Sequence, residues 1–413
     1  MRDMIPCVGM ERNRMTGGAS VEETLSLTVE GLRAVKEKIR PLFGQDRVAV
    51  SAEHYLETLL GNLPRKTGWQ RAEAAGDEGP WRQQALLGRT QWDADGLRDI
   101  VRDHVQSTLG DEDAVLVIDE TGFLKKGKAS CGVGRQYTGS AGKITNCQVG
   151  VFAAYVSSRG HAFVDRALYL PKAWTSDPVR LSAASVPADV TFATKPSLAR
   201  QMIERGLQAG LPFEWVAADS VYGVGEIEMS LRHAAKGYVL GVAGSHWFNS
   251  WGLGERPVAG EARDIARDAP EEDWVSLSAG HGTKGDRQYD WLWCPLAELE
   301  GADYTPADNR TWIRGLLVRR NPADGDLAYF TVWSPSGTTP EKLVQVEGTR
   351  WRIEEGFRTA KNEFGLDHNE TRSWHGWHRH VSLVMLAYAL MAGVRAQAND
   401  RSPKKRPANP HQV

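Results

Sequence analysis

The stretch RWRIEEGFRTAK, residues 350–361, combines a carboxylate with cations in a pattern suited to chemistry on a phosphodiester. At about 100° per residue, an α-helix gathers four of its charged side chains within about 80° of arc: Arg350, Glu354, Arg358 and Lys361. The adjoining arc is apolar and should face a core: Ile353, Phe357, Ala360 and Phe364. Glu355 lies outside both arcs, and we expect it to face solvent. Glu354 could therefore bind a hard cation such as Mg²⁺, or simply pair with a neighbouring arginine.

Two more acids follow short apolar runs that are typical of buried strands. Asp119 comes after Ala114–Ile118, and Asp219 comes after Trp215–Ala218. We place both at the carboxyl ends of strands in a mixed sheet, where sites usually form. Glu120 should point to the other side of its strand, because side chains alternate. Either aspartate alone could be a strand-end cap, but with Glu354 the set could hold two Mg²⁺ or Mn²⁺ ions.

The elements that must position these acids divide the chain into six parts. We expect an α/β protein in which a mixed sheet is flanked by helices, with a helical N-terminal domain and a β-rich insertion. The predicted parts are a disordered N-terminus (1–20), a helical domain (21–110), the first part of the core (111–244), the insertion (245–340), the second part of the core (341–398) and a basic tail (399–413). The second part of the core is predicted to begin with one helix from about Glu341 and to continue with a buried helix over about His378–Ala396.

Bulk properties exclude several classes of protein. The 413 residues carry a formal net charge of −2, so nucleic acid could be bound only through local basic patches. The four cysteines have no CxxC spacing, which argues against a zinc site and is typical of a reducing cytoplasm. No signal peptide opens the chain, and the apolar run Val381–Val394 is too short to span a bilayer. We expect a cytoplasmic protein that does not use a membrane.

These residues and motifs resemble a DDE transposase of a bacterial insertion sequence, of the cut-and-paste kind with an RNase H-like core. The first acid of the family matches Asp119 in VLVIDETGFLKKG, and the second matches Asp219 in VAADSVYG. The third matches Glu354, in a branch with a tyrosine-x2-arginine-x3-glutamate-x6-lysine signature. Arg350, Glu354 and Lys361 fit that spacing, whereas Glu347 stands at the tyrosine position. The resemblance covers nearly the whole chain.

The resemblance implies an RNase H-like mixed sheet and Mg²⁺- or Mn²⁺-dependent strand cleavage and joining at terminal inverted repeats. It also implies double-stranded DNA as the partner, both transposon ends and target, bound by a homodimer in the bacterial cytoplasm, at the nucleoid. Asp119, Asp219 and Glu354 would be the catalytic metal ligands. The expected DNA contacts are Lys125, Lys126, Lys128, Arg135, Arg350, Arg358 and Lys361.

Alternative interpretations remain open from the sequence. The chain could be a domesticated, transposase-derived DNA-binding protein or regulator, a stand-alone RNase H-like nuclease, or a glycosidase with paired carboxylates. Tryptophans of the insertion (Trp247, Trp251 or Trp312) could stack on an unpaired base, or they could pack within the sheet. The cluster Trp374–His380 could suggest a metal site, but we expect it to pack or to touch DNA.

Overall fold

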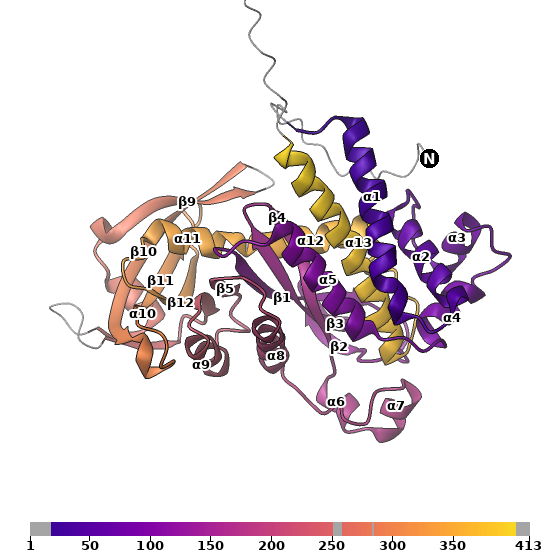
Figure 1. The fold of residues 1–413 in the computed structure, drawn as a ribbon. Helices are drawn as coiled ribbons and strands as arrows, with labels where there is room; N and C mark the ends of the chain where they lie inside the picture. The colour runs from indigo at the N-terminus through magenta and orange to yellow at the C-terminus, as the bar shows by residue number, and fades with distance from the viewer. Residues whose placement is uncertain (1–17, 251–257, 283–284, 402–413) are drawn as a thin grey trace, which may run out of the picture.

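A mixed sheet of ten strands runs through the molecule, with helices on both of its faces (Figure 1). The structure is a computed structural model that describes residues 18–250, 258–282 and 285–401. The predicted basic tail lies outside the described residues apart from 399–401, and so does the predicted N-terminal tail up to residue 17. Ser20, at the end of that predicted tail, caps the first helix through a reciprocal pair of hydrogen bonds with Glu23.

The chain alternates between helical and β-rich segments. The strands are β1 Val115–Leu124, β2 Gly134–Thr138, β3 Lys143–Ser157, β4 Gly160–Tyr169, β5 Trp215–Ala218, β6 Gly237–Val242, β7 Trp247–Asn249, β8 Ala259–Glu261, β9 Trp274–Gly282, β10 Gly285–Glu300, β11 Thr311–Arg320 and β12 Leu327–Pro335. The helices are α1 Val21–Ile39, α2 Asp46–Leu60, α3 Gly68–Ala74, α4 Trp81–Gly88, α5 Ala94–Leu109, α6 Lys172–Thr175, α7 Pro178–Ala183, α8 Lys195–Gln208, α9 Gly225–His233, α10 Ala262–Asp268, α11 Pro340–Thr349, α12 Trp351–Asn362 and α13 Trp374–Asp400.

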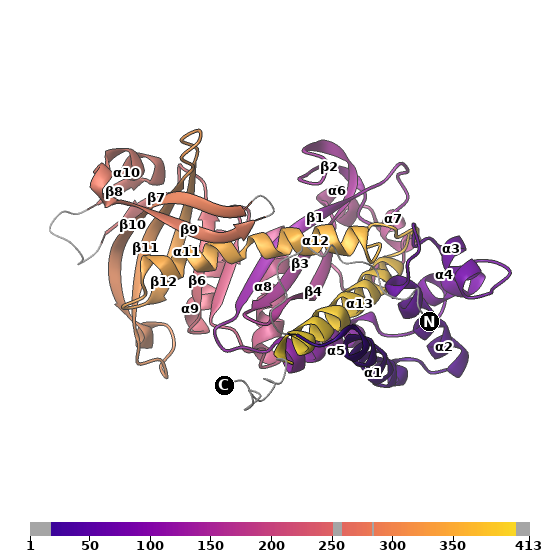
Figure 2. The same cartoon turned by 90° about the horizontal axis from the view of Figure 1, so that it is seen from above.

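The first half of the sheet has the RNase H-like arrangement. Strand β3 pairs antiparallel with both β4 and β1, and β1 then pairs parallel with β5, which pairs parallel with β6. The spatial order is therefore β4-β3-β1-β5-β6, with β2 added beside the first residues of β3. Helices α8 and α9 cover one face of this sheet, while α11, α12 and α13 cover the other (Figures 1 and 2).

The segment predicted as a β-rich insertion continues this sheet. Strand β12 pairs antiparallel with β6, and β11, β10 and β9 follow in order. Outside the shared sheet, a smaller hydrophobic cluster around Phe248, Leu292 and Leu316 holds the short β7–β8 pair and α10 against the insertion. The catalytic sheet and the insertion are therefore hydrogen-bonded together along β6 and β12.

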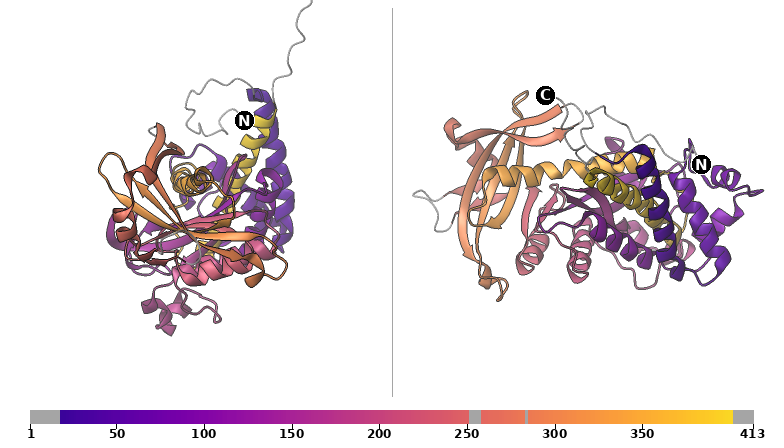
Figure 3. Two further views of the ribbon diagram at one scale, coloured as in Figure 1. Left: turned by 90° about the vertical axis from the view of Figure 1, so that its left-hand side faces the viewer. Right: turned by 45° about the horizontal axis from the view of Figure 1, so that its top comes forward.

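The N-terminal helices share the main hydrophobic core with the sheet. Leu97 and Val101 of α5 are fully buried in the same cluster as Phe163 of β4 and Leu386 of α13. Helix α13 lies beside α1 and α5 in two views (Figures 2 and 3). It is apolar and long enough to cross a membrane by composition, but 72% of its most apolar window is buried inside the protein. The predicted buried helix is thus confirmed.

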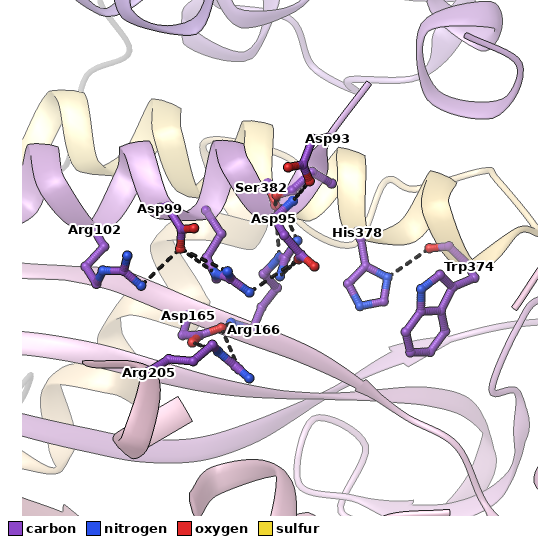
Figure 4. A network of polar contacts seen from close by, with 12 residues as sticks. Asp93, Asp95, Asp99, Arg102, Asp165, Arg166, Arg205, Trp374, His378 and Ser382 are labelled. Atoms are coloured by element: carbon purple, nitrogen blue, oxygen red, sulfur yellow. Dashed lines mark hydrogen bonds and ion pairs between the residues drawn. The ribbon is translucent and has the colours of Figure 1, made fainter. Parts of the chain in front are cut away.

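A buried arginine fixes these helices to the sheet (Figure 4). Arg166 of β4 is 2% exposed, and its Nη1 lies 2.8 Å from Oδ1 of Asp95 in α5. Its Nε donates to Oγ of Ser382 in α13 at 2.9 Å, and its Nη2 donates to the carbonyl of Ala94 at 2.9 Å. Burial raises the pKa of Asp95, but the charges of Arg166 and Arg98 and the Arg166 hydrogen bond together lower it more, so the pKa falls to about 2. One side chain thus connects α5, β4 and α13.

Replacing this arginine should destabilise the whole molecule. An Arg166→Ala variant loses the hydrogen bonds of a buried guanidinium to Ser382 and to the Ala94 carbonyl. A hydrogen bond from a charged group contributes about 1.5–3 kcal/mol, so the two together contribute about 3–6 kcal/mol. We expect urea unfolding to report a loss in that range. Arg267→Ala, which removes an exposed ion pair with Asp264, is the matched control and should change stability by less than about 1 kcal/mol. Equal losses in the two variants would contradict the role of Arg166.

Candidate active site

The first two acids lie on neighbouring strands at matching positions. In the parallel pairing of β1 with β5, Ile118 is opposite Ala218, so Asp119 and Asp219 follow at adjacent points, with their strands about 4.8 Å apart. The prediction that Asp119 ends its strand is wrong, because β1 continues to Leu124 along β3. What ends at Ile118 is the pairing with β5, and that opens the space beside Asp119.

Two glycines allow the loop of the second acid to approach the sheet closely. A Cβ on Gly241 of β6 would lie 2.9 Å from the carbonyl carbon of Asp219, and a Cβ on Gly223 would lie 1.9 Å from the carbonyl oxygen of Gly241. Asp219 Oδ1 accepts from the backbone N–H of Val221 at 2.9 Å, which fixes the turn that follows the strand. The loop therefore holds the carboxylate of Asp219 in one place.

Glu120 supports the same loop from the opposite face of β1. As predicted, it points away from Asp119: its carboxylate pairs with Lys195 of α8 and accepts a hydrogen bond from the Tyr222 hydroxyl. Burial and the charge of Glu120 raise the pKa of Tyr222, so that phenol stays a donor. The sequence interpretation missed this positioning contact, for which Tyr222, three residues after Asp219, was the available signal.

The third acid comes from a helix that begins at a break. One helix was predicted from about Glu341 through Lys361, but the structure has α11 and α12, which meet at Arg350. The Arg287 side chain from β10 donates to the carbonyl of Gly348 at 2.8 Å and thus takes an acceptor of the helical ladder. Gly348 itself packs against the backbone of β9, where a Cβ would lie 2.3 Å from the Ala279 oxygen. The break therefore comes from the insertion, through contacts that local sequence does not encode.

Arg350, at this break, lies within electrostatic reach of all three acids. Burial lowers the pKa of its guanidinium, but the charges of Glu347, Asp119, Glu354 and Asp219 raise it above the ordinary value. Its Nη1 lies 3.7 Å from Oε1 of Glu354. All three predicted catalytic carboxylates thus act electrostatically on one cation, and their common metal site remains a prediction.

The two glutamates of α12 do not divide as expected. Ile353, Phe357 and Ala360 are buried, as predicted for the apolar arc. The Glu355 side chain, however, is only 30% exposed, compared with 40% for Glu354, so the prediction that it faces solvent is wrong. It bonds Arg352 at 2.9 Å. Burial raises the pKa of Glu355, but this hydrogen bond and the nearby positive charges lower it below its ordinary value. Glu355 is a structural residue on the side of α12 away from Arg350.

The raised pKa values of the three acids indicate that Arg350 only partly neutralises their negative charge. Burial, reinforced by the charge of Asp219, raises the pKa of Asp119 to about 7. Burial also raises the pKa values of Asp219 and Glu354. Three carboxylates short of positive charge are suitable donors for Mg²⁺ or Mn²⁺, which prefer oxygen ligands. Within the described ranges, no three Asp, Glu, His or Cys side chains already lie close enough together to hold a metal ion.

Glu347, at the tyrosine position of the signature, is buried beside this site. It is 3% exposed, and its Oε1 accepts from Nη1 of Arg319 in β11 at 3.0 Å. Its Oε2 has no donor within the part of the chain that the structure describes. The charge of Glu347 acts on both Arg350 and Glu354. A buried carboxylate thus replaces the tyrosine and is balanced by an arginine of the insertion.

The predicted DNA-contacting cations fall into three groups. Lys126, Lys128, Arg135 and Arg358 are exposed. Lys125 donates to the carbonyl of Asn369 at 2.7 Å. Arg350 lies among the acids, and the Lys361 ammonium donates to Thr121 Oγ1, Ser140 Oγ and the Gly122 carbonyl at 2.8, 2.9 and 3.2 Å. With all its protons engaged, Lys361 holds α12 against β1, and a phosphate would have to replace one of these bonds.

Among the tryptophans proposed for base stacking, Trp312 is fully buried and stacks on Trp333 at 5.3 Å, so that role is excluded for it. Trp247 of β7 is 62% exposed, and Trp251 lies outside the described residues. The Trp374–His380 cluster packs as expected. His380 is buried, with Nδ1 at 2.8 Å from the Tyr55 hydroxyl and Nε2 at 3.1 Å from the Gly365 carbonyl.

Comparisons with known proteins identify the family of this chain. The family "DDE superfamily endonuclease" matches residues 40–283, and the family "Transposase DDE domain" matches residues 183–390, each more than half of the chain. The chain therefore belongs to the DDE superfamily endonucleases, and it is an enzyme of the transposase class. A regulator without catalytic activity is not favoured.

Two individual proteins illustrate the relationship. The chain is 25% identical to a probable transposase for insertion sequence element IS701 from Microchaete diplosiphon over 319 residues. The aligned region covers 74% of this chain and 72% of that protein. A piggyBac transposase, solved by cryo-EM as a synaptic complex with hairpin DNA, aligns with a TM-score of 0.38 and 11% identity over 91% of this chain and 72% of that one. The fold assignment rests on the sheet topology and not on this distant alignment.

The raised pKa of Asp119 predicts how stability depends on pH without divalent ions. Between the ordinary pKa of 3.8 and the folded value of about 7, the folded protein retains a proton that the unfolded chain has lost. This contribution to stability is complete below pH 4 and is lost as the pH rises to about 7. Asp119→Asn should therefore have a higher Tm than the wild type at pH 8, by a margin that vanishes near pH 4.

Thermal unfolding in a chelating buffer over pH 4–8 would measure this margin. Glu112→Gln, which alters an exposed acid of the loop before β1, is the control and should change Tm little at any pH. A difference between wild type and Asp119→Asn that does not vary with pH would show that Asp119 is ionised throughout.

Proposed function

We propose that this transposase carries out metal-dependent cleavage and strand transfer of DNA at the terminal inverted repeats of an insertion sequence. Asp119, Asp219 and Glu354 would hold the divalent ions, two Mg²⁺ or Mn²⁺. The observation that supports this most directly is the action of all three carboxylates on the single Arg350 guanidinium. Bound ions would lower the pKa of an attacking water or 3′-hydroxyl and stabilise the leaving oxygen of the phosphodiester.

The protein's own groups prepare this chemistry by fixing positions and charge. Asp119 and Asp219 are fixed by the sheet and by the Asp219 loop, while Lys361 holds α12, and with it Glu354, against β1. Because these contacts already exist in the folded protein, they limit the movement that would bring the three carboxylates onto bound ions. Arg350 offsets part of the negative charge that would otherwise repel the DNA backbone.

DNA is the proposed substrate and partner. The exposed cations Lys126, Lys128, Arg135 and Arg358 would contact backbone phosphates, which position a duplex without reading its sequence. Two copies of the chain would act together on the paired ends of one element, in the bacterial cytoplasm and at the nucleoid. Similarity to an insertion-sequence transposase supports the choice of ends as substrate.

The two adjacent glutamates of α12 provide a matched test. The substrate is a plasmid that carries the inverted repeats flanking the gene, incubated with Mg²⁺ and the full-length protein. Glu354→Gln should reduce strand cleavage by more than about 100-fold, beyond the usual cost of losing a partner of a metal ligand, while DNA binding persists. Glu355→Gln, one residue away on the other side of the helix, should cleave at a rate close to the wild type.

Gel analysis of nicked and joined products gives the readout, and a binding assay in Ca²⁺ checks that each variant is folded. Active Glu354→Gln together with inactive Glu355→Gln would refute the assignment of the third acid. Wild-type protein that binds the repeats but never cuts them in Mg²⁺ or Mn²⁺ would refute the proposed function.

A further inference from the structure

A cleft of about 280 Å³ lies between two loops at the carboxyl-terminal end of β1. One wall is the segment 125–130 that follows β1, and the other is the segment 369–372 that leads into α13. The walls are joined by hydrogen bonds: Lys125 Nζ donates to the Asn369 carbonyl at 2.7 Å, and the N–H of Cys131 donates to the Arg372 carbonyl at 2.9 Å. The cleft is thus built from segments that hold each other in place.

The charge of this cleft is positive. Lys125, Lys126 and Arg372 line it against one acid, Glu370, whose Oε2 accepts from the N–H of Gly68 at 3.1 Å. Lys126 and Arg372 are exposed, and neither side chain has a hydrogen-bond or ion-pair partner within the described ranges. A ligand could therefore bind these two cations without breaking a hydrogen bond or ion pair among the described residues.

The polar groups around these cations are mainly donors without acceptors. Among the described residues, the backbone N–H groups of 126–130 have no hydrogen-bond acceptor. Asn369 is 4% exposed; its Oδ1 accepts from the N–H and the hydroxyl of Thr371, at 3.0 and 2.8 Å. Its Nδ2 has no acceptor among those residues. Cations beside unsatisfied N–H groups match the oxygens of a phosphate.

We propose that this cleft binds one backbone phosphate of the DNA strand that enters the active site. The inference rests on the proposed function, because it takes DNA as the substrate. Lys125 follows Asp119 by six residues along β1, a span of about 20 Å at about 3.4 Å per residue. One DNA strand carries a phosphate about every 3.4 Å of helix axis, so a DNA strand that runs along β1 would place the bound phosphate roughly six nucleotides from the cleaved bond.

The test measures binding of full-length protein to duplex DNA ends in which one phosphate at a time is replaced by a neutral methylphosphonate. Wild-type protein should lose affinity at one position, roughly six nucleotides from the cut. A Lys126→Ala/Arg372→Ala double variant should bind all ends more weakly and be indifferent to that replacement. The slope of log K against log[salt] should fall by about one unit for the lost contact.

Arg200→Ala, on α8 at the opposite face of the sheet, is the control and should retain the wild-type position and slope. A double variant with the same sensitive phosphate and slope as the wild type would overturn the proposal. Competition by inorganic phosphate without any change in DNA binding would also overturn it, in favour of a free-anion site. Because binding is measured without cleavage, loss of cutting with an intact phosphate effect would refute only the proposed function.

Discussion

The arrangement of the active site depends on one electrostatic constraint, which is that several partly buried carboxylates must share too little positive charge. Arg350 is the cation on which Asp119, Asp219, Glu354 and Glu347 all act. Glu347 is paired with Arg319, and a single guanidinium cannot neutralise the other three acids, so burial and repulsion leave the pKa of Asp119 near 7. Such a site is costly to the folded protein, and the proposed divalent ions would offset that cost.

The rest of the fold keeps these charges in position. The sheet aligns Asp119 with Asp219, and the insertion, through Arg287 and Arg319, sets the break that begins α12 and neutralises Glu347. On the other side, Arg166 connects the N-terminal helices to the sheet and to α13. The insertion and the helical part are therefore joined to the sheet by specific contacts, and the insertion directly contacts the helices that carry Glu347 and Glu354.

Much of this could be predicted from the sequence because the signals were local. Strand β5 has the bounds of its apolar run, and the predicted apolar arc of α12 is buried. The continuation of β1 past Asp119 could not be predicted, since it depends on pairing with β3. The break at Arg350 depends on Arg287, which is distant in sequence, and the burial of Glu355 depends on α12 packing beside β4. Long-range contacts thus account for each of these errors.

The central claim, that these three segments form one metal site, can be tested directly by replacing Mg²⁺ with Fe²⁺ and generating hydroxyl radicals in place. Radicals cut the backbone within a few ångströms of a bound iron, and mass spectrometry of the fragments locates the cuts. The account predicts cuts near Asp119, Asp219 and Glu354 in the same protein, suppressed by excess Mg²⁺ and absent from Glu354→Gln. Cuts confined to other segments, or unchanged in that variant, would contradict it.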